Sequence, residues 1–261
     1  MSKLRKDDQE LAKQLEEGVT IGSAWPRLWT APLGCPRIHH RLTDSTNEQA
    51  RGLAEAGAPH GTVVTADEQR AGRGRQGREW TAPPGSAVLM SLVLRDLDER
   101  HALLPLAAAV AVCEACEAAG VPAARVKWPN DVWIDRRKVA GMLIEGRPQA
   151  GWAVLGIGIN VTTDSFPPEL ANIATSLRLA GYETTSEAVL FDLIAALDRW
   201  IGAPPEAVLE AWRSRDALKG ERVRWSDGDG TADGIDDSGA LLVQTRNGPV
   251  TLDAGEVHLL R

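Results

Sequence analysis

The feature that most constrains the fold is a run of strand-like segments joined by very short connections. Four apolar or alternating segments lie at residues 125–128, 132–134, 139–145 and 152–161, and the connections between them are three, four and six residues long. A crossover between parallel strands needs about a dozen residues or more, whereas hairpin connections are far shorter. These segments therefore predict an antiparallel arrangement and exclude a doubly wound parallel sheet.

Segments with helical periodicity flank these strands. Ser45 and Glu48 have the spacing of a capping box, which predicts a helix that ends before Gly57. Further helices are expected at residues 103–119, 186–201 and 205–218, and two more strands at 61–65 and 86–94. The pattern predicts the α+β class.

The chain changes character after residue 220. Short alternating segments at 222–225, 231–235, 240–245 and 250–252 are separated by turn signals such as Asp227-Gly228 and Asn247-Gly248. They predict a small SH3-like β-barrel. The expected organisation is an N-terminal extension at 1–37, with a charged helical segment near its start, a main domain at 38–218 and this domain at 219–261.

Residues 72–78 read Gly-Arg-Gly-Arg-Gln-Gly-Arg and match the G-x-G-x-x-G dinucleotide fingerprint. That fingerprint requires its last glycine to open a helix, and the Pro-Pro-Gly at 83–85 prevents one. The stretch is instead a loop between two strands. Its glycines allow close backbone approach, and Arg73, Arg75 and Arg78 predict binding of phosphate or carboxylate.

Composition excludes several classes of protein. The net charge of −7 argues against general affinity for nucleic acid. Cys35, Cys113 and Cys116 do not form a disulfide framework, and the lone Cys-x-x-Cys is typical of core packing. The longest apolar stretch, 103–113, is too short to span a bilayer, and no signal pattern opens the chain. A cytoplasmic protein is expected.

Lys127 ends a predicted strand, and Asn130 and Asp131 lie on the turn that follows. A lysine there supplies a cation for phosphate or carboxylate, and the Asn and Asp oxygens suit Mg²⁺ or ribose hydroxyls. Ordinary turn chemistry explains the same residues, so both interpretations stay open.

Three glycines, Gly141, Gly156 and Gly158, lie inside apolar strands. They leave one face of the sheet bare, as the floor of a pocket would be, or they mark a structural bulge. Ser45 and Thr46 are explained by a helix N-cap alone, although they and Gln69 also offer polar groups to a ligand.

The order of the motifs resembles the biotin–protein ligase family. Asp44-Ser-Thr-Asn47 is followed by the loop from Gln69 to Trp80, then by Lys127-Trp-Pro-Asn-Asp131, Lys138-Val-Ala-Gly-Met-Leu-Ile-Glu145 and Gly156-Ile-Gly-Ile-Asn-Val161. The resemblance covers about residues 38–261. It implies a catalytic domain similar to class II aminoacyl-tRNA synthetases, with a mixed, largely antiparallel sheet.

The resemblance also implies a two-step reaction. The biotin carboxylate attacks the α-phosphate of Mg·ATP to give biotinyl-5′-AMP and pyrophosphate. A lysine of the biotin carboxyl carrier protein of an acyl-CoA carboxylase then attacks the mixed anhydride. Both attacking groups belong to substrates, so no enzyme nucleophile is required.

The resemblance assigns a role to each motif residue. The implied catalytic residues are Lys127, Arg73 and Arg75. The implied biotin-binding residues are Ser45, Thr46, Asn47, Gln69, Gly72, Arg73, Lys127, Gly141, Gly156 and Gly158. The implied ATP or adenylate contacts are Arg73, Arg75, Arg78, Trp80, Asn130, Lys138 and Asn160, and Asp131 is the implied Mg²⁺ ligand.

Two departures and two rival functions accompany the resemblance. Only 44 residues precede Ser45, fewer than the winged helix-turn-helix of repressor members needs, so we expect no DNA binding. Gln76 stands where the family often has another arginine. The rivals are a lipoate or octanoate ligase or transferase, which typically has an Arg-Arg-x-x-Gly-Gly-Gly stretch, and a non-catalytic ligand- or RNA-binding module. A homodimer stays open.

Overall fold

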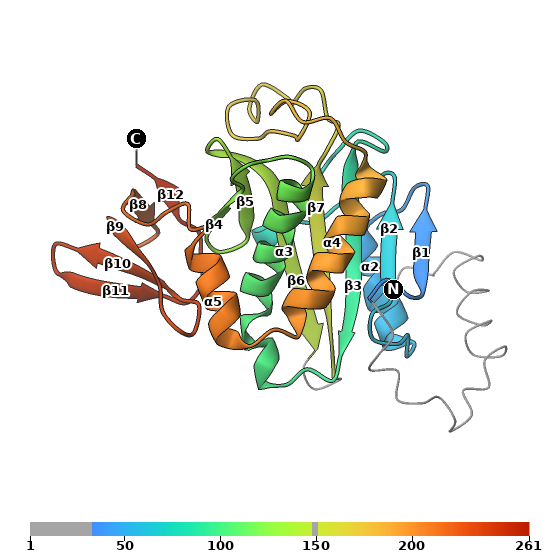
Figure 1. The fold of residues 1–261 in the computed structure, drawn as a ribbon, viewed down its shortest axis with the longest axis horizontal. Helices are drawn as coiled ribbons and strands as arrows, with labels where there is room; N and C mark the ends of the chain where they lie inside the picture. The colour runs from blue at the N-terminus through green and yellow to red at the C-terminus, as the bar shows by residue number, and fades with distance from the viewer. Residues whose placement is uncertain (1–32, 148–150, 261) are drawn as a thin grey trace.

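The computed structural model describes residues 33–147 and 151–260, which form two β-sheets with helices packed on the larger one (Figure 1). The charged segment predicted near the N-terminus lies outside the described residues, as does most of the predicted extension at 1–37. The seven-stranded sheet forms the centre of the molecule, and the five-stranded sheet lies at the C-terminal end of the chain.

The large sheet is mixed and almost entirely antiparallel, as predicted. Its strands run in the order β1 (Arg37–His40), β2 (Val63–Ala66), β3 (Ala87–Arg95), β7 (Trp152–Asn160), β6 (Arg137–Arg147), β5 (Asp131–Ile134) and β4 (Arg125–Lys127). Among the described strands of this sheet, only β1 and β2 pair in parallel. Short connections account for antiparallel neighbours in the rest of the sheet. For example, β5 and β6 are joined through Asp135 and Arg136, which both have positive φ, as a tight two-residue hairpin turn requires.

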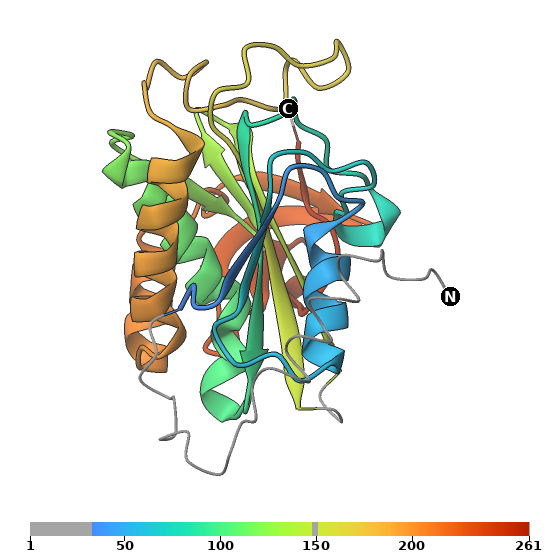
Figure 2. The same cartoon turned by 90° about the vertical axis from the view of Figure 1, so that its right-hand side faces the viewer.

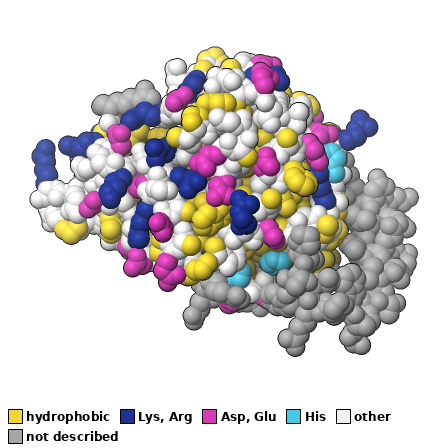
Figure 3. Space-filling model, in the orientation of Figure 1, with side chains coloured by type: hydrophobic (Ala, Val, Ile, Leu, Met, Phe, Trp, Pro, Cys, Tyr) yellow, Lys and Arg dark blue, Asp and Glu magenta, His cyan; other side chains and the backbone are white. Residues whose placement is uncertain are grey.

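Helices cover both faces of this sheet (Figure 2). Helix α2 (Thr46–Glu55) packs against β2, β3 and β7 on one face, and α3 (Leu104–Ala118), α4 (Ser186–Ile201) and α5 (Pro205–Arg213) lie on the other. The exposed charges on the face shown in Figure 3 are of both signs and interspersed, so that face has no broad basic surface.

Helix α3 is the apolar centre of the helical layer. By length and composition alone, the stretch His101–Ala118 is long and apolar enough to cross a membrane. The prediction from residues 103–113 alone underestimated the length of this apolar stretch. It is 67% buried within the fold, as the core helix of a globular domain would be. Cys113 and Cys116 are both fully buried on it, and desolvation raises the pKa of Cys116 to about 12. Core packing therefore explains the Cys-x-x-Cys spacing.

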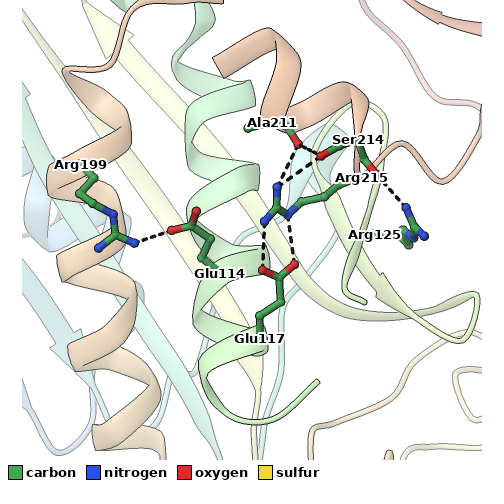
Figure 4. A network of polar contacts seen from close by, with 7 residues as sticks. All are labelled: Glu114, Glu117, Arg125, Arg199, Ala211, Ser214 and Arg215. Atoms are coloured by element: carbon green, nitrogen blue, oxygen red, sulfur yellow. Dashed lines mark hydrogen bonds and ion pairs between the residues drawn. The ribbon is translucent and has the colours of Figure 1, made fainter. Parts of the chain in front are cut away.

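Helix α5 is shorter than predicted because the chain after it joins the edge of the sheet. The amide of Val126 donates to the carbonyl of Arg215 at 2.8 Å, and the amide of Ala217 donates to the carbonyl of Val126 at 2.9 Å. The Arg215 guanidinium donates to both carboxylate oxygens of Glu117 on α3, at 3.1 and 3.0 Å (Figure 4). These bonds fix β4, the strand that ends at Lys127.

The second sheet is antiparallel and five-stranded. Its order is β11 (Gly248–Leu252), β10 (Leu241–Thr245), β9 (Gly228–Ile235), β8 (Arg222–Trp225) and β12 (His258–Leu259). Four of these strands coincide closely with predicted segments, and the two-residue β12 was missed. The sheet agrees with the predicted small β domain.

Trp128 joins the two sheets, and it gives a stability prediction. Its side chain is 2% exposed, and its indole Nε1–H donates to the carbonyl of Gly239 at 3.0 Å. Trp128→Phe leaves that carbonyl without its donor, so we expect the free energy of unfolding to fall by about 1–3 kcal/mol. Chemical denaturation measures this change. Trp133→Phe on β5, where the side chain is partly exposed, is the matched control, and an equal loss there would contradict the prediction.

Candidate active site

One cavity of about 510 Å³ gathers most of the predicted site residues. It lies over the glycine-containing stretches of β6 and β7, beside the start of α2 and beneath the Arg/Gly loop. The predicted residues that line it are Ser45, Thr46, Asn47, Gln69, Arg73, Arg75, Arg78, Trp80, Asn130, Lys138, Gly141, Gly156, Gly158 and Asn160. Gly72, Lys127 and Asp131 lie close to it but are not among its lining residues.

The three strand glycines form the floor, and none of them is itself an unpaired bulge residue. Gly156 and Gly158 lie in regular pairing with β3 and β6, and Gly141 pairs with Asp131 and Gly158, although the β5–β6 register shifts close to Gly141, between Val132 and Trp133. A methyl group on Gly158 would lie 2.5 Å from Cε2 of Trp80, and one on Gly156 would lie 2.0 Å from Oδ1 of Asn47. The glycines are therefore needed because other side chains lie directly on the sheet.

The start of α2 differs from the predicted capping box. Ser45 occupies the N-cap position and is only 1% exposed, but its hydroxyl does not cap the helix. The carboxamide oxygen of Gln69 instead accepts from the amide of Thr46 at 2.7 Å and from its hydroxyl at 3.0 Å. This leaves the Ser45 hydroxyl available to a ligand in the cavity.

Two residues that the sequence reasoning missed organise this polar cluster. Ser91 on β3 donates to Oδ1 of Asn47 at 2.6 Å and approaches Oγ1 of Thr46 at 2.9 Å. Asn47 in turn donates through Nδ2 to Glu145 Oε2 at 2.9 Å. The available signal was a polar residue inside the apolar 87–95 strand and a carboxylate at the end of β6.

The Arg/Gly loop folds back on itself. The amide of Gly74 donates to the carbonyl of Arg78 at 2.7 Å, and the amide of Trp80 donates to the carbonyl of Gly72 at 2.9 Å. A methyl group on Gly72 would lie 2.3 Å from the Trp80 carbonyl oxygen. Gly72 is thus required by the closeness of the two loop strands, and it does not line the cavity.

The second sheet contacts this loop. Arg75 donates to the Gly255 carbonyl at 3.4 Å, and Arg78 forms an ion pair with Glu256. Arg75 also donates to Oδ1 of Asn130 at 3.0 Å, while Nδ2 of Asn130 donates to the Met142 carbonyl. Asn130, predicted as a nucleotide contact, therefore positions Arg75.

A cluster of cations lies where the loop meets β4 and β5. Lys127 is 9% exposed; burial lowers its pKa most, and the carboxylate of Asp131 opposes that shift. The charges of Lys138, Arg78 and Arg75 also lower it. Lys127 has no ion pair within residues 33–147 and 151–260. Four cations thus lie near two carboxylates, Asp131 and Glu256, and this excess of positive charge makes the region attractive to an anion.

Asp131 is engaged by a side chain. Its Oδ1 lies 2.7 Å from Nζ of Lys138, and Lys138 Nζ lies 5.5 Å from the centre of a Trp80 ring. Across the described part of the chain, no group of three or more His, Cys, Asp or Glu residues could hold a metal ion. Mg²⁺ at this place would depend mainly on oxygens of its substrate.

The rim segment at residues 163–174 was not predicted as part of the site. Its contributions to the lining are Thr163, Ser165, Phe166, Pro167, Leu170, Ile173 and Ala174. The backbone of Lys138 anchors its end through bonds with Ile173 and Thr175, both 2.8 Å long. Asn160 donates to the Thr175 carbonyl at 3.1 Å, so it also holds this rim. The sequence signal for this segment was Phe166, which lies in a polar loop of a chain with only two phenylalanines.

The fold and the site define a ligase of small carboxylic acids, and comparison with known proteins agrees. Residues 40–163 match the Biotin/lipoate A/B protein ligase family, and residues 220–260 match the Biotin protein ligase C terminal domain. A Mycobacterium tuberculosis biotin–[acetyl-CoA-carboxylase] ligase is 34% identical over 98% of this chain and 96% of its own length. The chain belongs to the biotin protein ligase family.

Two further relatives place the chain within that family. The bifunctional ligase/repressor BirA of Bacillus subtilis is 36% identical over 89% of this chain and 76% of its own length. The Aquifex aeolicus biotin protein ligase, solved in complex with biotin and ATP, superposes with a TM-score of 0.76 and 30% identity. That alignment covers 86% of this chain and 98% of the other.

Proposed function

We propose that this protein is an ATP-dependent biotin protein ligase that forms biotinyl-5′-AMP and transfers biotin to a lysine of a biotin carboxyl carrier protein. The observation that carries this proposal is one cavity with a polar cluster at the start of α2 and cationic side chains in its lining, beside the buried Lys127. The first suits an amide-like ring, and the second suits a carboxylate meeting a phosphate.

The polar cluster would hold the ureido ring. Gln69 uses its oxygen on Thr46, so its Nε2 is free to donate, and the Ser45 hydroxyl can donate or accept. Gly156 and Gly158 would let the rings of biotin lie close to the sheet. Trp80 would close the apolar side over Gly141 and Gly158.

The cation cluster would perform the first chemical step. Carboxylate and α-phosphate repel each other, so the reaction needs positioning and neutralisation more than an enzyme nucleophile. Lys127 would bridge the two groups as negative charge builds, with Arg73, Arg75 and Arg78 around them. Lys138, Asn160 and the rim would complete the nucleotide site, and Mg²⁺ would be held by the phosphates with Asp131. The carrier lysine would then attack the acyl carbon and release AMP.

Biotin-dependent exchange of pyrophosphate into ATP tests the proposal, with lipoate and octanoate as alternative acids. We expect exchange with biotin only. Exchange with lipoate or octanoate but not biotin would favour the rival ligase. No exchange with any acid would favour a binding module. The absence of DNA binding, the cytoplasmic location and a homodimer stay predictions.

Arg75→Gly is expected to release the adenylate several-fold faster while leaving its formation possible. The change removes the contacts of Arg75 with Asn130 and Gly255 that hold the loop, and it leaves the Lys127 side chain in place. The loss of radiolabelled biotinyl-5′-AMP from the preformed complex measures this rate. Arg246→Gly, on an exposed turn of the second sheet, is the control, and an unchanged rate for Arg75→Gly would contradict the prediction.

A further inference from the structure

Glu145 lies at a junction that the predicted roles do not use. It is on β6, the strand that carries the floor residue Gly141, and its side chain is 26% exposed. Three groups converge on it: the amide of Asn47 at 2.9 Å, the guanidinium of Arg73 at 3.7 Å and that of Arg51 at 3.8 Å. It therefore joins α2, β6 and the Arg/Gly loop.

One branch of this junction fixes the orientation of Asn47. The Asn47 side chain is buried and lies directly on Gly156. A carboxylate only accepts hydrogen bonds, so Glu145 requires Nδ2 of Asn47 to point toward it. Oδ1 then faces Ser91, whose hydroxyl donates to it at 2.6 Å. Through Ser91 and Thr46 the chain of contacts reaches Gln69.

The other branch reaches the loop. Arg73 lines the cavity, and in the described part of the chain Glu145 and Glu48 are the carboxylates within 4.0 Å of its guanidinium. The carboxylate of Glu48 lies 3.9 Å from Arg73, and among the described residues it makes no hydrogen bond with the side chain of Asn47. Glu145 is thus the group that contacts both the loop and the polar cluster.

We infer that Glu145 is a positioning residue: it holds the Asn47 amide for biotin binding and holds Arg73 over the bound acid. The inference rests on the proposed function. The effects of Glu145 on biotin binding and on the loop can be separated, because Asn47 needs a hydrogen-bond acceptor whereas Arg73 needs a negative charge. Glu145→Gln keeps an acceptor for Asn47 and removes the charge, and Glu145→Ala removes both.

Biotin binding without ATP, measured by calorimetry, tests the first branch. We expect Glu145→Ala to weaken biotin binding about tenfold, since it removes a hydrogen bond to a charged group. Glu145→Gln should weaken it less than threefold. Asn47→Ala and the double variant with Glu145→Ala form a cycle, and the effects should be far from additive. Additive effects, or equal losses in the Gln and Ala variants, would overturn this branch.

The rate of adenylate loss tests the second branch. Glu145→Gln and Glu145→Ala should both release biotinyl-5′-AMP about threefold faster, because an exposed ion pair is weak. Arg51→Gln touches the same carboxylate but not the cavity, and it should match the wild type. A thermal midpoint within a few degrees of wild type guards against a general structural effect. Unchanged adenylate loss in both Glu145 variants would overturn this branch.

Pyrophosphate exchange by the wild-type protein distinguishes failure of the positioning role of Glu145 from failure of the proposed function. If the wild type exchanges with biotin and the Glu145 variants do not behave as expected, the positioning role is wrong and the proposed function stands. If the wild type neither binds biotin nor exchanges, the proposed function itself is wrong.

Discussion

Lys127→Ala is expected to slow the formation of biotinyl-5′-AMP by about 100- to 1,000-fold, which is typical of losing one buried group that stabilises developing charge. Lys127 is buried beside Asp131, Lys138, Arg75 and Arg78, so its charge acts where water is largely excluded. A single-turnover measurement with biotin and labelled ATP gives the rate. A rate within threefold of the wild type would remove Lys127 from the mechanism.

The pH dependence provides a second readout of the same residue. Burial lowers the pKa of Lys127 from the ordinary value of 10.5. The reactive form is the cation, so the rate should be constant at lower pH and fall as the pH rises through this lowered pKa. Lys127→Arg keeps a cation that does not lose its proton in this range. Its rate, although reduced, should lack that alkaline fall.

Gly158→Ala is expected to weaken biotin binding by at least about tenfold and to lower the free energy of unfolding by about 1–3 kcal/mol. The added methyl group would lie 2.5, 2.7 and 2.8 Å from three atoms of the Trp80 indole. The ring cannot flex out of the way as a linear side chain would, so it must leave the floor. Calorimetry with biotin measures the affinity, and chemical denaturation measures the stability.

Gly202→Ala is the matched control for this experiment. Gly202 follows α4, its φ is −96°, and a methyl group there meets nothing within 4 Å. It should leave biotin binding unchanged. Biotin affinity of Gly158→Ala equal to that of the control would show that the floor tolerates a side chain, and that Trp80 does not need its present position.

The sequence predicted elements well where local patterns decide them. Helix α4 was predicted with the bounds that the structure has, because its N-cap threonine and apolar periodicity are local signals. Strand β1 was missed, since it has only four residues and alternates between exposed and partly buried positions. Its partner β2 lies more than 20 residues away in sequence. Helix α5 was predicted too long for a related reason: pairing with β4 stops it.

The site was predicted in its membership but less in its contacts. Motif order brought Thr46, Gln69 and the glycine floor together correctly. No local pattern shows that Gln69, and not Ser45, accepts the hydrogen bond from the first amide of α2, because the two positions are 24 residues apart. The same is true of Ser91 and Glu145, whose roles exist only once β3 and β6 lie beside α2. The rim at 163–174 lacks any glycine or charge motif and was missed for that reason.

The cover that residues 215–217 provide for β4 has a consequence for association with other polypeptides. A sheet edge offers unpaired amides and carbonyls to which a foreign strand can add. Within residues 33–147 and 151–260, β4 is paired on its outer side and β1 is the other edge of the large sheet. Strand addition to this sheet is thereby directed to β1, where Arg37 is held by Glu187 at 2.6 Å. Because residues 215–217 already pair with β4, a strand from another molecule cannot pair there and displace the strand that ends at Lys127.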